Sequence, residues 1–142
     1  MRLAAHQHVL VEELMHLEDA QERLMAVVER ARRHARLTDE QRGPAHRVPG
    51  CSSSVWLASE LRNGRCYFRA DADSPVVRGL VALLADFFSS ATPREIIATE
   101  IDPLETLGLV GMLSLTRRTG LTAVRKAIVA FAVHASQADG VS

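Results

Sequence analysis

The stretch "VWLASELRNGRCYFRA", residues 55–70, decides the fold. Its two halves, 55–61 and 66–70, are short runs of mostly apolar and aromatic residues on either side of Asn63-Gly64. Asn-Gly is the strongest short hairpin signal because both residues tolerate a positive φ. The sequence therefore predicts an antiparallel β-hairpin with strands at 55–61 and 66–70.

Helices are predicted on both sides of this hairpin. Apolar residues spaced three and four apart predict one amphipathic helix over 9–36. After the hairpin, "SPVVRGLVALLADFFSS" (74–90) is apolar on most sides and predicts a buried central helix. Ser74 is a suitable N-cap for it, and Pro75 suits the first helical position.

The last third of the chain predicts three further helices. "TPRE" (92–95) is a capping box that begins a short helix, and "DPLE" (102–105) begins another, which is expected to run to about residue 113. A break at Gly120 precedes a final amphipathic helix to about residue 138. The order of elements predicts an α+β fold, with a small antiparallel sheet of about three strands packed by several helices. One domain over residues 1–142 is expected.

Composition and charge narrow the functional classes. The 142 residues include 17 basic and 17 acidic side chains, which gives a formal net charge of zero. A general nucleic-acid binder would need a basic excess to neutralise phosphates, so that class is not expected. No apolar run approaches the roughly 18–20 residues of a membrane span, and the first residues lack a signal-peptide pattern. We therefore expect a cytoplasmic protein that binds neither nucleic acid nor membrane.

The common catalytic and metal-binding motifs are missing from the sequence. There is no phosphate-binding glycine loop, no Cys-x-x-Cys and no Gly-x-Ser-x-Gly nucleophile elbow. His6 and His8 could both reach a metal, but no cysteine or carboxylate cluster with ligand spacing supports them. The sequence thus predicts neither a metal site nor a bound cofactor.

Cys51 is the main candidate for chemistry. It lies in "VPGCSSSVW" (48–56), after a Pro-Gly turn signal and before the first strand. Gly50 lacks a Cβ and allows another backbone to approach closely. A reactive thiol needs nearby cations, and the candidates are His46, Arg47, Arg117 and Arg118. The residues alone leave two interpretations open, a reactive thiol and a small apolar turn residue.

The second cysteine, Cys66, is expected to be structural. It begins the returning strand and alternates with Phe68 and Ala70, which predicts that it faces the core. A Cys51–Cys66 disulfide is not expected, because the presumed compartment is reducing and no other cysteines are present.

Four sequence blocks together resemble the SufE/CsdE family of sulfur-acceptor proteins. They are "VPGCSSSVWL", "FRADADSPVVRGLVALL", "TPREI" and "LGLVGMLSLTRRTGLTAVRKAI", in the order and spacing typical of that family, from about residue 20 to 132. Ser53 and Trp56 match the Ser and Trp of the family's cysteine motif. The family arginine falls on Arg117, and Arg118 beside it is the second candidate.

The resemblance implies a SufE- and IscU-like fold and a specific activity. Such proteins activate a pyridoxal-phosphate-dependent cysteine desulfurase of the SufS or CsdA type. Their thiol, here Cys51, accepts persulfide sulfur and passes it to an iron–sulfur scaffold or another acceptor. The protein would then be a sulfurtransferase-like accessory protein, with Gly50, Ser53, His46, Arg117 and Arg118 supporting the thiol. Two other functions stay open: a non-catalytic interaction module on the same fold, and a small thiol redox protein.

Overall fold

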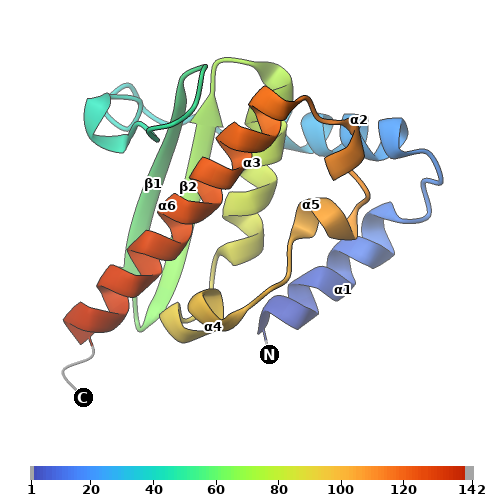
Figure 1. Ribbon diagram of the computed structural model, residues 1–142. Coiled ribbons are helices and arrows are strands. Elements are labelled where there is room, and N and C mark those ends of the chain that lie inside the picture. Colours follow the sequence, from blue (N-terminus) through green and yellow to red (C-terminus); the bar gives the residue numbers. More distant parts are fainter. Residues whose placement is uncertain (1, 140–142) are drawn as a thin grey trace.

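The computed structural model describes residues 2–139 and has the α+β architecture that the sequence predicts (Figure 1). Two strands form one antiparallel sheet, and helices pack around it. The elements in chain order are α1 (Arg2–Leu14), α2 (Ala20–Arg32), the 3-10 turn η1 (Pro44–His46), β1 (Val55–Arg62), β2 (Arg65–Ala72), α3 (Pro75–Phe88), α4 (Pro93–Ala98), α5 (Pro103–Thr106), the 3-10 turn η2 (Val110–Met112) and α6 (Leu115–Asp139).

The predicted hairpin is confirmed, and its strands are slightly longer than expected. Asn63 and Gly64 form the turn with φ values of 51° and 77°, the positive values that make Asn-Gly suitable there. The register pairs Leu57 with Ala70. Within residues 2–139 the sheet has two strands instead of about three, and the only further β pairing is an isolated bridge between Arg47 and Trp56.

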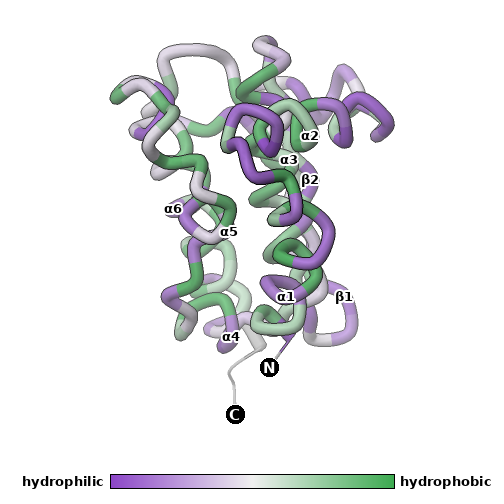
Figure 2. The backbone as a smooth tube through the Cα atoms, turned by 90° about the vertical axis from the view of Figure 1, so that its right-hand side faces the viewer, coloured by the Kyte–Doolittle hydropathy of each residue, from purple (hydrophilic) through white to green (hydrophobic). Residues whose placement is uncertain are grey.

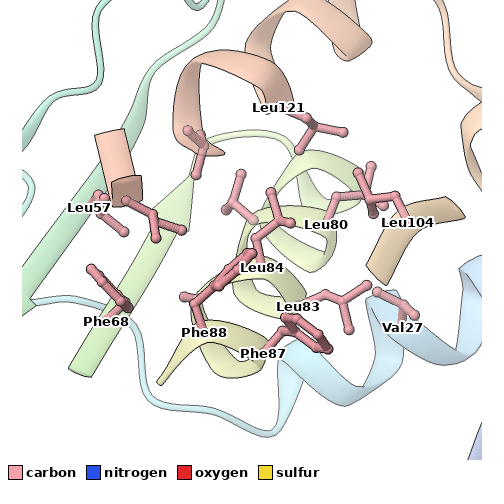
Figure 3. Packing of buried hydrophobic residues seen from close by; sticks show 14 of the residues in the cluster. Val27, Leu57, Phe68, Leu80, Leu83, Leu84, Phe87, Phe88, Leu104 and Leu121 are labelled. Atoms are coloured by element: carbon pink, nitrogen blue, oxygen red, sulfur yellow. The ribbon is translucent and has the colours of Figure 1, made fainter. Parts of the chain in front are cut away.

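Helix α3 lies at the centre of the molecule. It packs against β2, α2 and α6, and it also contacts α1 and α5. Leu80, Leu84 and Phe88 of α3 are almost completely buried. Figure 3 shows them between Leu57 and Phe68 of the hairpin on one side and residues of α2, α5 and α6 on the others. The apolar character of α3 on most sides is thus explained by neighbours on most sides.

The peripheral helices are amphipathic. In Figure 2 the tube of α1 carries both hydrophobic and hydrophilic residues, and Leu3, Leu10 and Leu14 form its buried side. The start of α1, the end of α6 and the short helix α4 all lie at one end of the molecule (Figures 1 and 2). Within residues 2–139 no helix has the length and apolar character needed to cross a bilayer.

The prediction of one continuous helix over 9–36 was wrong, because the chain bends between α1 and α2. Asp19 caps α2 by accepting a hydrogen bond from the N–H of Gln21. The buried side chain of Arg23 donates to the carbonyl oxygen of Leu17 at 2.5 Å and to that of Leu107 at 2.7 Å. These bonds fix the bend against α5, a tertiary contact that helical periodicity cannot reveal.

Two helix boundaries near the C-terminus also differ from the prediction. Helix α5 ends at Thr106, well before residue 113, and Gly108 follows with a φ of +67° that ends the helical path. Helix α6 continues through Gly120 without a break. A glycine inside a helix costs about 1 kcal/mol, an amount that tertiary packing can override.

Asp71, at the end of β2, joins three segments through one buried carboxylate. Its side chain is fully buried and accepts hydrogen bonds from Arg36 and from the backbone N–H groups of Leu37 and Ala72. Arg78 of α3 lies 3.4 Å away as a second ion-pair partner. Burial alone would raise the pKa of Asp71, but the hydrogen bonds from Arg36 and the two backbone donors outweigh it and lower that pKa.

We predict that Asp71→Asn lowers the free energy of unfolding by about 2–3 kcal/mol. This loss is smaller than the one expected when one partner of a fully buried ion pair is removed, because the side chains of both arginines reach solvent. The folded-state pKa of Asp71 lies below its unfolded value of about 4, so its stabilising effect is present above that pH and is lost in acid. Urea unfolding should show that the free energies of unfolding of the variant and the wild type converge as the pH falls below about 4. Asp73→Asn, an exposed neighbour, is the matched control and should change little at any pH.

The crossing of α2 and α3 depends on Gly79. A Cβ at this position would lie 2.9 Å from the Cα of Val28, a backbone atom that cannot move independently of its helix. We predict that Gly79→Ala destabilises the protein by about 1–3 kcal/mol through overpacking. Gly111→Ala is the control, since a Cβ there meets nothing within 4 Å. Equal melting temperatures for the two variants would contradict this account of the crossing.

Candidate functional site: a thiol on a tied loop

Cys51 lies at the tip of a short loop that is tied at its base. The N–H of Val48 donates to the carbonyl oxygen of Val55 at 2.8 Å, and Arg47 and Trp56 form the isolated bridge next to it. Six residues, 49–54, therefore project from a fixed base. Gly50 has a φ of +87°, which L-residues with a side chain rarely adopt, so the turn before the thiol needs glycine.

The loop places the thiol against the N-terminal half of α6. Sγ of Cys51 is 3.6 Å from the carbonyl oxygen of Gly120, within the range of a weak S–H···O hydrogen bond. The side chain is half-buried and packs against the hydrophobic core. A Cβ on Gly120 would be 3.7 Å from Sγ, an ordinary contact. One side of the thiol is thus covered by the helix while the side chain keeps partial access to solvent.

Two opposing effects act on the ionisation of Cys51. Burial raises the pKa of the thiol, and the positive charge of Arg47 lowers it to a smaller extent, so the net pKa lies above that of an ordinary cysteine. The resting thiol is therefore mainly protonated at neutral pH. A protonated thiol is a poor nucleophile, which protects the group until its surroundings change.

The other residues predicted to support the thiol lie in the loop itself, in η1 and in α6. Ser53 is in the loop and partly buried, and Gly50 precedes the thiol. His46 lies in η1 at the base of the loop, and its Nδ1 is buried without a hydrogen-bond partner among residues 2–139. In that part of the chain neither His46, Arg117 nor Arg118 donates a hydrogen bond to Cys51.

Arg117 and Arg118 lie in the first turn of α6 and differ in their contacts. Arg117 is exposed, and its backbone N–H donates to Oγ of Ser114. The side chain of Arg118 donates through Nε to the carbonyl oxygen of Leu113. Arg118 also lines a surface hollow beside Pro49 and Gly50, so it is the one of the two that borders the thiol loop.

The remaining candidates have structural partners. Cys66 is fully buried, which confirms its predicted core position, and both cysteines are present as unpaired thiols. His6 contacts the carbonyl oxygen of Phe87 through Nδ1 at 2.6 Å, and His8 pairs with Glu12. Among the described residues no group of three or more His, Cys, Asp or Glu side chains could hold a metal ion.

Comparison with known proteins decides the family. The family model for SufE, described as an Fe–S metabolism associated domain, matches residues 8–132. The chain belongs to the SufE family. Membership associates it with iron–sulfur metabolism, and it confirms the resemblance carried by the four sequence blocks.

Two relatives agree with this assignment. A SufE-like protein of Rhizobium etli, described as uncharacterized, is 32% identical over 124 residues, covering 84% of each chain. The solution structure of a hypothetical protein from Thermus thermophilus matches with a TM-score of 0.73 at 17% identity, covering 93% of this chain and 96% of that one. At that identity the second match shows the shared fold alone.

The sequence singled out Cys51 as the candidate thiol but did not reveal parts of its surroundings. Gly120 appeared as a helix break, whereas its carbonyl is the hydrogen-bond partner of Cys51. Arg47 was one of four candidate cations, and the structure singles it out as the one whose charge lowers the pKa of the thiol. The signal available in the sequence was an apolar residue, Val48, directly before Pro49-Gly50, and the structure buries this residue at the anchored base of the loop.

We predict that Arg47→Ala slows alkylation of Cys51 by iodoacetamide about twofold at pH 7.5, the size expected for an exposed charge interaction. In the variant the charge of Arg47 no longer offsets part of the effect of burial, so the pKa of the thiol is higher than in the wild type. The rate–pH profile of alkylation should therefore move to higher pH. The rate can be followed by mass spectrometry of the Cys51 peptide. Arg33→Ala, at the exposed end of α2, is the control and should match the wild type. An unchanged profile for Arg47→Ala would contradict the role assigned to this charge.

Proposed function

We propose that this protein is a sulfur acceptor and activator of a pyridoxal-phosphate-dependent cysteine desulfurase, and that it carries persulfide sulfur on Cys51 for iron–sulfur cluster assembly. The observation that carries the proposal is the half-buried thiol at the tip of a tied loop in a chain of the SufE family. The proposed donor is a desulfurase of the SufS or CsdA type.

The transfer step needs no oxidant or reductant. The thiolate of Cys51 attacks the terminal sulfur of the donor's cysteine persulfide, R–S–SH. A new S–S bond forms on Cys51 as the donor's S–S bond breaks, and the donor leaves as the thiolate R–S⁻. The product on this chain is Cys51–S–SH, and one sulfur atom with its proton has moved between the two cysteines.

The geometry of the loop suits a carrier that alternates between shelter and exposure. At rest the thiol lies against α6 near the Gly120 carbonyl, where burial keeps its pKa high and its reactivity low. Engagement with the donor would move Sγ out of this contact, which removes the desolvation that raises the pKa. Gly50 supplies a flexible point next to the thiol, while the Val48–Val55 hydrogen bond keeps the base of the loop in place.

The surface around the loop supports docking of the donor. Leu115, at the start of α6, is a large apolar side chain that is 78% exposed. It lines the same hollow as Pro49, Gly50 and Arg118. We propose that the donor binds over this hollow, that Ser53, His46, Arg117 and Arg118 support the thiol in the complex, and that sulfur then passes to a scaffold or another acceptor. The setting proposed for the transfer is the cytoplasm.

The test incubates the protein with a SufS-type desulfurase, pyridoxal phosphate and cysteine, and then measures peptide masses under non-reducing conditions. We predict a gain of one sulfur on the Cys51 peptide and its loss in Cys51→Ser, because a hydroxyl cannot form the persulfide. Cys66→Ala is the matched control and should still gain sulfur, since Cys66 is buried in the core.

Other results would favour a different function. Binding to the desulfurase without sulfur gain on Cys51 would indicate a non-catalytic interaction module. Oxidation of Cys51 by mild peroxide, without sulfur gain from the desulfurase, would indicate a redox protein. Either outcome would contradict the carrier role.

A further inference from the structure

A groove beside α6 adjoins the proposed docking hollow and shares part of its rim, but the apolar floor of the groove has no part in the proposed sulfur transfer. It has a volume of about 570 Å³ and lies between α6, the central helix α3 and the α5–η2 segment. Small-molecule sites in proteins commonly occupy about 300–1,000 Å³. The groove is therefore large enough for a small ligand.

The floor of the groove is apolar and comes from four separate parts of the chain. Leu84 of α3, Leu104 of α5, Leu113 and Leu121 are buried residues that line it. Val110 and Val129 are partly buried and continue the apolar surface toward the rim. Such a floor favours a ligand with an apolar body, because burial of apolar area is the main driving force of its binding.

The rim carries an excess of positive charge. Arg118, Arg125 and Lys126 of α6 line the groove, and the one acidic lining residue is Asp102. Asp102 already caps α5 by accepting from the N–H of Leu104. Within residues 2–139 none of the three cations forms an ion pair with a carboxylate. The charge on the rim is thus unbalanced by neighbouring groups.

The excess of positive charge on the rim is a local feature and does not reflect the charge of the whole chain. Its formal net charge is zero, so a groove with three cations and one carboxylate is a local concentration of charge. Arg125 is additionally held over the ring of Phe88 at 5.2 Å, which restricts one of the cations to the groove. An apolar floor with a cationic rim is complementary to an amphipathic anion.

We propose that this groove binds a small amphipathic monoanion, a carboxylate with an alkyl chain of medium length. The chain would lie on the leucine floor, and the carboxylate would meet the cations of α6. The groove shares Arg118, Thr122 and Lys126 with the hollow beside Gly50, so the ligand would lie next to the thiol loop without occupying it. This site is independent of whether Cys51 carries sulfur.

The test uses decanoate as the probe and isothermal titration calorimetry on the full chain. We expect saturable binding with one site, and an affinity that falls with added salt because the rim charges are exposed to solvent. Decyltrimethylammonium, with the same chain and the opposite charge, should bind at least about fivefold more weakly. Equal binding of the two probes, or no saturable binding of decanoate, would overturn the proposal.

Two variants locate the site, each with a matched control. Lys126→Glu reverses one rim charge and should weaken decanoate binding about fivefold, whereas Arg33→Glu, away from the groove, should not. Ala130→Trp places a large side chain at an exposed lining position and should abolish binding, whereas Ala45→Trp in η1 should not. Far-UV circular dichroism checks that each variant is folded. Binding that survives both groove variants would place the ligand elsewhere and overturn the assignment.

Sedimentation velocity of the wild type and of Ala130→Trp tests the competing occupant of the groove, which is a second copy of the chain. If a second copy of the chain covered the groove, sedimentation velocity would show a dimer that Ala130→Trp converts to monomer. That result would contradict a small-molecule site. Persulfide formation on Cys51 is measured separately, so failure of decanoate binding leaves the proposed sulfur transfer untouched.

Discussion

The burial of α3 on most of its sides is the constraint on which the rest of the structure depends. The hairpin is too small to enclose a core by itself, because an isolated two-stranded sheet is marginally stable in water. Helix α3 supplies the missing apolar surface, and α2 and α6 cover its other sides (Figures 1 and 3). The close approach of α2 at Gly79 sets how tightly these layers can pack.

This arrangement also determines where the thiol lies. The buried carboxylate of Asp71 joins the end of the hairpin to the segment after α2 and to α3. The long connection between α2 and β1 is thereby anchored at one end, and the Val48–Val55 pair anchors it at the other. Packing of α6 on α3 then brings Gly120 to the loop. The position of Cys51 is therefore a consequence of core packing and not of the loop sequence alone.

The surroundings of Cys51 combine protection with latent reactivity. Burial disfavours the thiolate and Arg47 favours it, and in this structure burial is the stronger effect. In the proposed role as a sulfur carrier, this balance would be useful, because a thiol that is protonated at rest resists stray oxidants. The backbone of the loop is held at its base, and a weak contact holds the thiol at its tip. A partner of the kind proposed would therefore change the balance locally, without disturbing the hydrophobic core.

The sequence by itself determined the hairpin, the buried character of α3, the capped starts of α3, α4 and α5, and the identity of the candidate thiol. These features depend on local chemistry: the φ preferences of Asn-Gly, side-chain caps and apolar periodicity. Only the tertiary structure decided the bend after α1, the continuity of α6 through Gly120, the choice of Arg47 among the candidate cations and the cationic groove. Each of these depends on residues far apart in sequence, such as Arg23 with Leu107 and Cys51 with Gly120. Local patterns contain no information on which distant backbone atoms will become neighbours, because packing of the whole chain selects them.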